Sequence, residues 1–287
     1  MAAAREAVQE RVLHLGSEGH LVAIAADPAT AICTPTVIFL NAGVLHRVGP
    51  HRLHVLLSRR LAAAGTPAVR MDLSGIGDSR PLPSESSFRA SSVADTRAAM
   101  DQLGAAGQPA RFVLFGLCSG ADNALATASA DPRVVGLVLV DPPAYVTSQA
   151  IWRRRRASLR DPAWLFSLPR RSIQALLRRA SRAWTSLTAS AATPEPAPGR
   201  QAPPLPAYQR ELTALVDRGV RILAIYSGVL GDRYNASGQF DEFAPTLRGR
   251  VDVAWFPAAN HTFTERAAQA ELLATVLRWF DRQFRAP

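Results

Sequence analysis

Apolar residues recur along this chain in two patterns. Short apolar runs predict strands, and longer stretches with apolar residues at helical spacing predict helices. The predicted strands are 36–40, 68–71, 111–115, 134–140, 221–226 and 251–256, and the predicted helices are 51–64, 92–103 and 265–284. Before them, 7–15 and 20–26 flank a glycine-containing turn and predict an antiparallel hairpin. Strands that alternate with helices after a hairpin predict an α/β fold with an eight-stranded, mostly parallel, doubly wound sheet.

One segment interrupts this alternation after the sixth strand. Residues 151–184 are helical in character and carry ten arginines against a single acidic residue, Asp161. Residues 189–206 are rich in alanine and proline, a composition that favours an exposed connector over a regular helix. We therefore expect a core formed by 1–141 and 207–287, with an Arg-rich helical lid and its connector inserted over 142–206.

Candidate chemistry lies where the fifth predicted strand ends. The apolar run 112–115 leads into Gly116-Leu117-Cys118-Ser119-Gly120, and a helix rich in small residues follows. A nucleophile flanked by glycines between a strand and a helix is typical of a nucleophile elbow. The sharp turn leaves little room for side chains at Gly116 and Gly120. It also aims the Ser119 amide at an oxyanion beside the helix N-terminus.

Two other interpretations of this stretch remain open. Ser119 could be the nucleophile, although Leu117 would then stand where the first glycine of the elbow belongs. Cys118 could be a buried thiol without a chemical role, because free cysteine is among the most buried residue types. The spacing of the glycines favours Cys118.

Composition narrows the class of protein. The 287-residue chain has ample hydrophobic content (48%) for a core, and its formal net charge of +10 comes from arginine alone. With only Cys33 and Cys118, it lacks a disulfide framework, which fits a reducing compartment. No apolar run reaches the length of a membrane span, and the N-terminus lacks a long apolar stretch. We therefore expect a cytoplasmic protein.

These residues support a resemblance to a known family. Over nearly its whole length the chain resembles the α/β-hydrolase superfamily, and within it the bacterial hydrolases associated with exosortase and exopolysaccharide systems. The subgroup resemblance rests on Asn41-Ala42-Gly43, on His46 to Arg52, on Arg70 to Ser79 and on the Cys-bearing elbow Gly116-Leu117-Cys118. The resemblance implies the α/β-hydrolase fold and a Cys-His-Asp triad.

The resemblance also assigns the other triad members. His261, after the last strand, stands where the superfamily keeps its base, and the order nucleophile, acid, base is met. Two residues are candidates for the acid of the triad. Asp232 follows the seventh strand, where the superfamily usually keeps the acid, although the loop departs from the usual spacing by one residue. Asp141, at the tip of the sixth strand, is a known alternative location. We favour Asp232.

Further roles follow from the same resemblance. The oxyanion donors would be the Ser119 amide and a second amide after the third strand, at Gly43 or Val44. The basic residues Arg47, His51 and Arg52 follow closely, near the expected site mouth, and are candidates for binding an anionic group of the substrate.

The expected function is hydrolysis of a small-molecule thioester or activated ester through a thioester acyl-enzyme. Two alternatives remain: non-hydrolytic acyl transfer, such as Dieckmann-type cyclisation that releases a carrier-bound chain, or a non-catalytic ligand-binding homologue. No metal-ligand spacing is present, and no cofactor is expected. The Arg-rich lid suggests an acyl-carrier protein or CoA as partner. A membrane surface is a further option, and nucleic acid is disfavoured because no recognition motif accompanies the charge.

Overall fold

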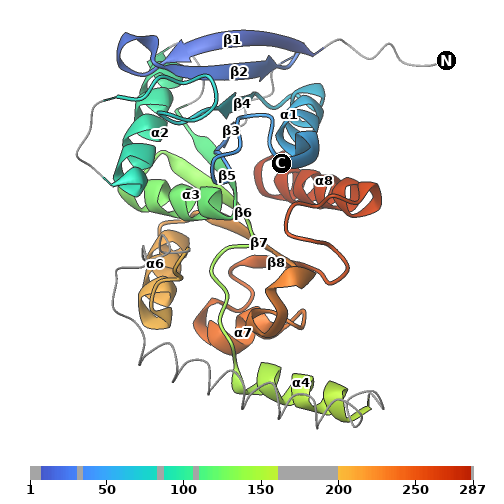
Figure 1. Ribbon diagram of the computed structural model, residues 1–287. Coiled ribbons are helices and arrows are strands. Elements are labelled where there is room, and N and C mark those ends of the chain that lie inside the picture. Colours follow the sequence, from blue (N-terminus) through green and yellow to red (C-terminus); the bar gives the residue numbers. More distant parts are fainter. Residues whose placement is uncertain (1–7, 31–34, 83–86, 106–109, 161–199, 286–287) are drawn as a thin grey trace, which may run out of the picture.

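Eight strands form one sheet in the order β1-β2-β4-β3-β5-β6-β7-β8 (Figure 1). The computed structural model describes residues 8–30, 35–82, 87–105, 110–160 and 200–285. The strands are β1 Gln9–Leu15, β2 Leu21–Asp27, β3 Thr36–Phe39, β4 Ala68–Met71, β5 Phe112–Leu117, β6 Val134–Val140, β7 Arg221–Ser227 and β8 Asp252–Phe256. β1 and β2 form the antiparallel hairpin, β2 pairs antiparallel with β4, and all other neighbours are parallel. The predicted eight-stranded, mostly parallel sheet is confirmed.

Helices cover both faces of the sheet (Figure 1). The α-helices are α1 Leu53–Ala63, α2 Phe88–Ala105, α3 Ser119–Ala130, α4 Ser148–Arg160, α6 Leu205–Asp217, α7 Gln239–Phe243 and α8 Arg266–Phe280. Short turns of 3₁₀-helix are η1 Ser17–Gly19, η2 Pro50–Arg52, η3 Gly228–Arg233 and η4 Pro245–Leu247, and a π-helical turn, η5 Asp281–Arg285, follows α8.

Two hydrophobic clusters hold the layers together. One packs α2, α3 and α6 against one face of the sheet, and the other packs α1 and α8 against the opposite face. Every residue of β3, β4 and β5 is buried, because helices cover both sides of these central strands. Each fully buried large apolar side chain, such as Phe115 or Leu137, contributes roughly 1.5–3 kcal/mol relative to exposure. This rigid sheet fixes the strand ends at which the candidate residues lie.

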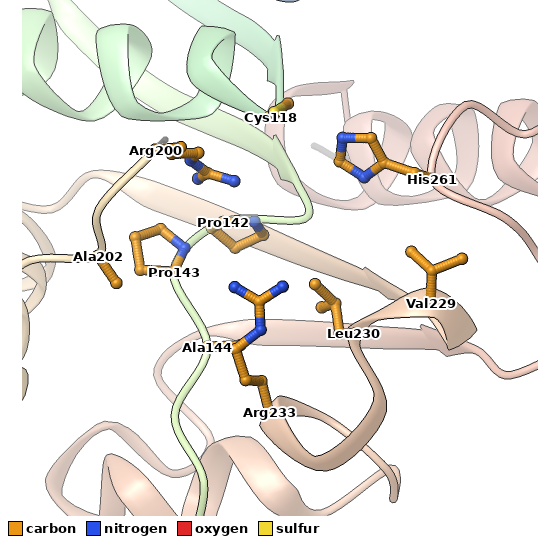
Figure 2. A pocket seen from close by; sticks show the side chains of 10 residues that line it. All are labelled: Cys118, Pro142, Pro143, Ala144, Arg200, Ala202, Val229, Leu230, Arg233 and His261. Atoms are coloured by element: carbon orange, nitrogen blue, oxygen red, sulfur yellow. The ribbon is translucent and has the colours of Figure 1, made fainter. Parts of the chain in front are cut away.

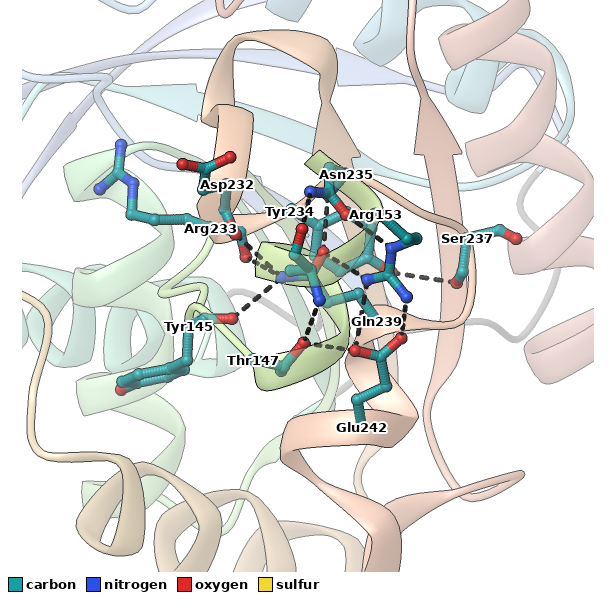
Figure 3. Close-up of polar contacts among 11 residues, drawn as sticks. Tyr145, Thr147, Arg153, Asp232, Arg233, Tyr234, Asn235, Ser237, Gln239 and Glu242 are labelled. Carbon is teal, nitrogen blue, oxygen red and sulfur yellow. Dashed lines mark hydrogen bonds and ion pairs between the residues drawn. The ribbon is translucent and has the colours of Figure 1, made fainter. Parts of the chain in front are cut away.

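The segment after β6 leaves the sheet and is held by contacts with the segment that follows β7. α4 extends away from the core and lies against η3 and α7 (Figure 1). Arg153 of α4 donates to Glu242 of α7 at 2.5 Å and to Asn235 at 2.9 Å, and the Asn235 side chain donates to the Ala150 carbonyl (Figure 3). α4 is therefore fixed at its first turns by partly buried polar contacts.

The predicted lid, 142–206, falls largely on residues 161–199, which lie outside the described residues. On the far side of that segment the chain is already packed against the core at Pro203, whose carbonyl accepts the Tyr145 hydroxyl at 2.7 Å. α6 begins at Leu205, two residues before the predicted boundary at 207, and the sequence analysis did not identify this helix. No helix among the described residues is long and apolar enough to cross a membrane.

Candidate active site

The turn between β5 and α3 positions Cys118. Cys118 has φ 58° and ψ −120°, a backbone conformation that costs roughly 1–3 kcal/mol for a residue with a side chain. A Cβ on Gly116 would lie 2.1 Å from the Gly120 carbonyl oxygen, and a Cβ on Gly120 would lie 2.6 Å from the Asn41 carbonyl oxygen. Only glycine fits at these two positions, so the strand, turn and helix expected around Cys118 are present.

The surroundings of the half-buried thiol favour its ionised form. The pKa of Cys118 is lowered, chiefly by a hydrogen bond with His261 that outweighs the opposing effect of burial. The positive charge of Arg200 and the Ser119 amide lower this pKa further. Arg200 is thus a contributor to the site that the sequence analysis did not identify.

His261 lies in the loop after β8, between Cys118 and Asp141. Its Nδ1 is 2.6 Å from Oδ2 of Asp141, which leaves Nε2 as the ring nitrogen available to Cys118. The hydrogen bond to Asp141, and then the one to Cys118, raise the pKa of His261 to about 9 against the effect of burial. His261 is therefore held as an imidazolium near neutral pH, beside a thiol whose pKa is lowered.

Asp141 follows the last residue of β6 and is fully buried. Besides His261, its carboxylate accepts the Ser227 amide and the Ser227 hydroxyl, both at 2.7 Å. Its φ of 49° is left-handed, a conformation that aspartate tolerates better than most residues. The buried charge is thus matched by hydrogen-bond donors, as buried carboxylates require.

The location of Asp232 differs from the expectation. Asp232 lies in η3, and its carboxylate pairs with Arg154 of α4. Among the described contacts it makes none with His261. β7 continues to Ser227, which occupies the position beside Asp141, and the 3₁₀ turn of η3 then follows. The structure therefore places Asp141, and not the favoured Asp232, in contact with His261.

The loop after β3 lies close to the elbow. The Gly43 amide donates to the Ser119 hydroxyl at 2.8 Å, and Gly43 has a positive φ of 59°. The side chain of its neighbour Val44 is 88% exposed. The predicted donors Ser119 and Gly43 are therefore brought together at the elbow, with the Gly43 amide occupied by a hydroxyl.

A pocket of about 310 Å³ opens beside Cys118 and His261 (Figure 2). It is lined by Cys118, Pro142, Pro143, Ala144, Arg200, Ala202, Val229, Leu230, Arg233 and His261. The residues after β6, the residues just before α6 and the turn η3 together form its walls.

The sequence of residues 37–275 matches the model of the alpha/beta hydrolase family. The chain belongs to this family. No curated protein has a sequence that matches that of this α/β hydrolase.

Solved structures share the fold at low sequence identity. A puromycin-hydrolysing peptidase of Mycobacterium tuberculosis is 16% identical with a TM-score of 0.56, and the match covers 98% of this chain but only 40% of the peptidase. An α/β serine hydrolase without a lid from Xanthomonas campestris is 15% identical with a TM-score of 0.55, over 98% and 97% of the two chains. An esterase of Pyrococcus furiosus is 15% identical with a TM-score of 0.55, over 96% and 91%. At these identities the likeness shows the fold.

The basic residues predicted to bind substrate do not line the pocket of this α/β hydrolase. Arg47 pairs with Asp72 and Asp78, and its backbone amide donates to Asp72 at 2.6 Å. His51 contacts the Thr264 hydroxyl at 3.2 Å. Arg52 is exposed, with φ 61°, at the start of α1. Arg47 joins the loop after β3 to the loop after β4, and substrate binding by Arg47, His51 and Arg52 stays a prediction.

The arginines that do line the pocket are Arg200 and Arg233. Arg200 binds Asp122 through two hydrogen bonds, at 2.5 and 2.7 Å, and donates to the Asp141 carbonyl at 2.8 Å. The sequence analysis missed it because it lies in a stretch interpreted as an exposed connector. Within the described parts of the chain, no three His, Cys, Asp or Glu side chains are grouped as metal ligands would be.

Proposed function

We propose that this α/β hydrolase transfers acyl groups through Cys118, with His261 as acid and base and Asp141 as the carboxylate that orients it. The observation that carries the proposal is the line of contacts from Asp141 through His261 to Cys118. A thiolate is the form of cysteine that attacks carbonyls, and the surroundings of Cys118 favour that form.

The proposed reaction has two halves. In the first, the Cys118 thiolate attacks the carbonyl carbon of a thioester or activated ester. A C–S bond forms and the carbonyl oxygen becomes an oxyanion, which the Ser119 amide stabilises. The Gly43 amide joins it when the oxyanion replaces the Ser119 hydroxyl as its acceptor. The oxyanion collapses, the bond to the leaving group breaks, and His261 Nε2–H protonates that group.

In the second half, His261 takes a proton from water, and the resulting hydroxide attacks the acyl-enzyme. The acid leaves as the C–S bond breaks, and the thiolate–imidazolium pair is restored. Asp141 stabilises the positive charge on His261 and holds its tautomer throughout. Family membership favours hydrolysis. An amine, alcohol or carbanion in place of water would give acyl transfer or Dieckmann-type cyclisation, and the identity of the product distinguishes these outcomes.

A trapping experiment tests the nucleophile. A panel of acyl thioesters is incubated with the protein, and the intact mass is followed with peptide mapping. We expect one acyl adduct, on Cys118. Cys118→Ala should lower activity by several orders of magnitude, as the loss of a triad nucleophile does. The matched control is Cys33→Ala, which removes the other cysteine of the chain and should retain activity. An adduct on Ser119, or the absence of an adduct on the wild-type protein with every thioester of the panel, would contradict the proposal.

For the leaving group we propose an acyl-carrier protein or CoA, met by the arginines of α4. Arg153 and Arg154 are already paired with Glu242 and Asp232. Arg155 is exposed, and Arg156 lies over the Trp152 ring at 5.2 Å. Only part of this charge is therefore available to an acidic partner. The resemblance to exosortase-associated hydrolases stays a prediction, and it names no substrate.

A further inference from the structure

Arg233 is the basic residue of the pocket for which the described residues provide no counter-ion. It ends η3, and its side chain points into the pocket from the wall opposite Cys118 (Figure 2). Among the described residues, its guanidinium has neither an ion-pair partner nor a hydrogen-bond acceptor, and the residue is exposed. An arginine directed into a pocket without a protein acceptor is available to bind a ligand.

The backbone beneath Arg233 is fixed on both sides. The fully buried Gln239 donates to the Arg233 carbonyl at 2.8 Å and also binds the carbonyls of Tyr145 and Asp232 (Figure 3). The next residue, Tyr234, is buried and stacks on Tyr226 with ring centroids 3.8 Å apart. None of the described residues thus holds the Arg233 side chain, while its backbone is held in place, which lowers the entropy cost of binding a ligand.

The other charges around the pocket are matched. Arg200 is paired with Asp122, and His261 with Asp141. No aspartate or glutamate is among the described residues that line the pocket. Within the part of the chain that the structure describes, the positive charge of Arg233 is therefore unbalanced, and it faces a wall of apolar residues that includes Ala144, Val229 and Leu230.

We propose that Arg233 binds a carboxylate at the far end of the acyl chain, so that the substrates are thioesters or esters of short dicarboxylic acids. This inference rests on the proposed function, because it requires the carbonyl to be at Cys118. The planar guanidinium binds a carboxylate with two parallel hydrogen bonds. The apolar wall suits the methylene groups between the carbonyl at Cys118 and the carboxylate at Arg233. The phosphates of CoA are separated from the thioester by the whole pantetheine arm, which a pocket of about 310 Å³ does not contain.

A binding titration tests this without turnover. Cys118→Ala protein is titrated with monomethyl glutarate and with dimethyl glutarate, with ligand-observed NMR as the readout. We expect the monoanion to bind about 10- to 100-fold more tightly, the range for a charge-assisted pair. Adding Arg233→Gln should abolish this preference, and Arg233→Lys should retain part of it. Equal affinity for the two ligands in Cys118→Ala, or a preference that survives Arg233→Gln, would overturn the inference.

Kinetics provide the second arm. The ratio of kcat/KM for a glutaryl thioester to that for its methyl ester should fall about 10- to 100-fold in Arg233→Gln. The matched control is Arg221→Gln, which removes an equal charge at the first residue of β7, the strand that leads into η3, at the end of that strand away from η3. It should leave the ratio unchanged. A CoA thioester of a neutral acid that loses as much as the glutaryl substrate would assign Arg233 to the leaving group and overturn the inference. If no thioester acylates Cys118, the proposed function fails, and the binding titration still decides the role of Arg233.

Discussion

Replacing Asp141 with asparagine changes the charge of the group that contacts His261 and little else. Asparagine has nearly the same shape, and it tolerates the left-handed φ of 49° at this position. Its amide oxygen can still accept the Ser227 amide. Its NH₂ group must then face the Ser227 hydroxyl and Nδ1 of His261, both of which donate to the carboxylate in the wild-type protein.

The expected loss follows from this reversal. An NH₂ group facing Nδ1 makes that nitrogen an acceptor, so the neutral ring carries its proton on Nε2 and cannot take one from the thiol. We expect kcat to fall about 10²- to 10⁴-fold, as when a triad carboxylate is neutralised elsewhere. The pKa of His261, now about 9, should fall towards 6.5, because the bond to Asp141 is the largest cause of the rise.

The same change alters stability in a pH-dependent way. The folded-state pKa of His261 lies above its unfolded value, so the stabilisation is fully present below about pH 6.5 and lost as pH rises through about 9. At 1.36 kcal/mol per pKa unit the rise corresponds to ~3 kcal/mol. Because the His261 side chain is 37% exposed and Cys118 shares the effect, we expect about 1–2 kcal/mol from Asp141 after screening.

The assay combines p-nitrophenyl ester turnover with urea unfolding at pH 6 and pH 9.5. The wild-type protein should lose stability between these pH values, and Asp141→Asn should lose less. The matched control is Asp232→Asn, which breaks the pair with Arg154 at the surface. Exposed pairs contribute about 0–1 kcal/mol, so this variant should keep its kcat and most of its stability. A variant Asp141→Asn with nearly wild-type kcat, or an equal loss in Asp232→Asn, would refute the reasoning.

Two other predictions concern Cys118 and the arginines of α4. The pKa of Cys118 is lowered, so its alkylation by iodoacetamide should reach half its maximal rate below the ordinary thiol value of about 8.5; a midpoint at or above that value would contradict a thiolate held by His261. If the exposed Arg155 and Arg156 meet an acyl-carrier protein or CoA, KM for that substrate should rise with salt, because exposed charges are screened over about 10 Å at 0.1 M. Replacing both with glutamine should flatten the salt dependence, and a KM that is constant from low to high salt in the wild-type protein would show that these arginines are only a solvated surface.

The sequence predicted the parts of the fold that depend on local patterns. The wholly apolar run Val134–Val140 was identified to the residue as β6, and the Gly116–Gly120 spacing led to the correct turn between β5 and α3. α6 was missed because its N-terminal end, Leu205, lies within the Ala/Pro-rich stretch 189–206, which was interpreted as a connector. Local composition does not show that the end of such a stretch forms a helix that packs against the core.

The choice of carboxylate could not be made from local patterns either. Asp141 and Asp232 each lie past the end of a strand, and His261 is distant from both in sequence. What separates them is tertiary: Ser227 lies beside Asp141, and Arg154 lies beside Asp232. One signal was available, because an aspartate directly after a fully apolar strand is buried and needs partners. For Arg200 and Arg233, no spacing in the sequence indicated the pocket, since it is formed by segments that meet only in the folded chain.

The carboxylate that contacts His261 belongs to Asp141, directly after β6, whereas the opposite wall of the pocket is formed by η3, after β7. Among the described contacts, Gly228–Arg233 supplies no hydrogen bond to Asp141 or His261. Substitutions at Val229, Leu230 or Arg233 can therefore reshape the pocket without shifting that carboxylate. During evolution, the residues of the proposed reaction can therefore be kept while the substrate that the pocket accepts changes. Homologues that share the elbow and Asp141 are thus free to differ in η3, and directed evolution towards new acyl groups would begin with a library at these three positions.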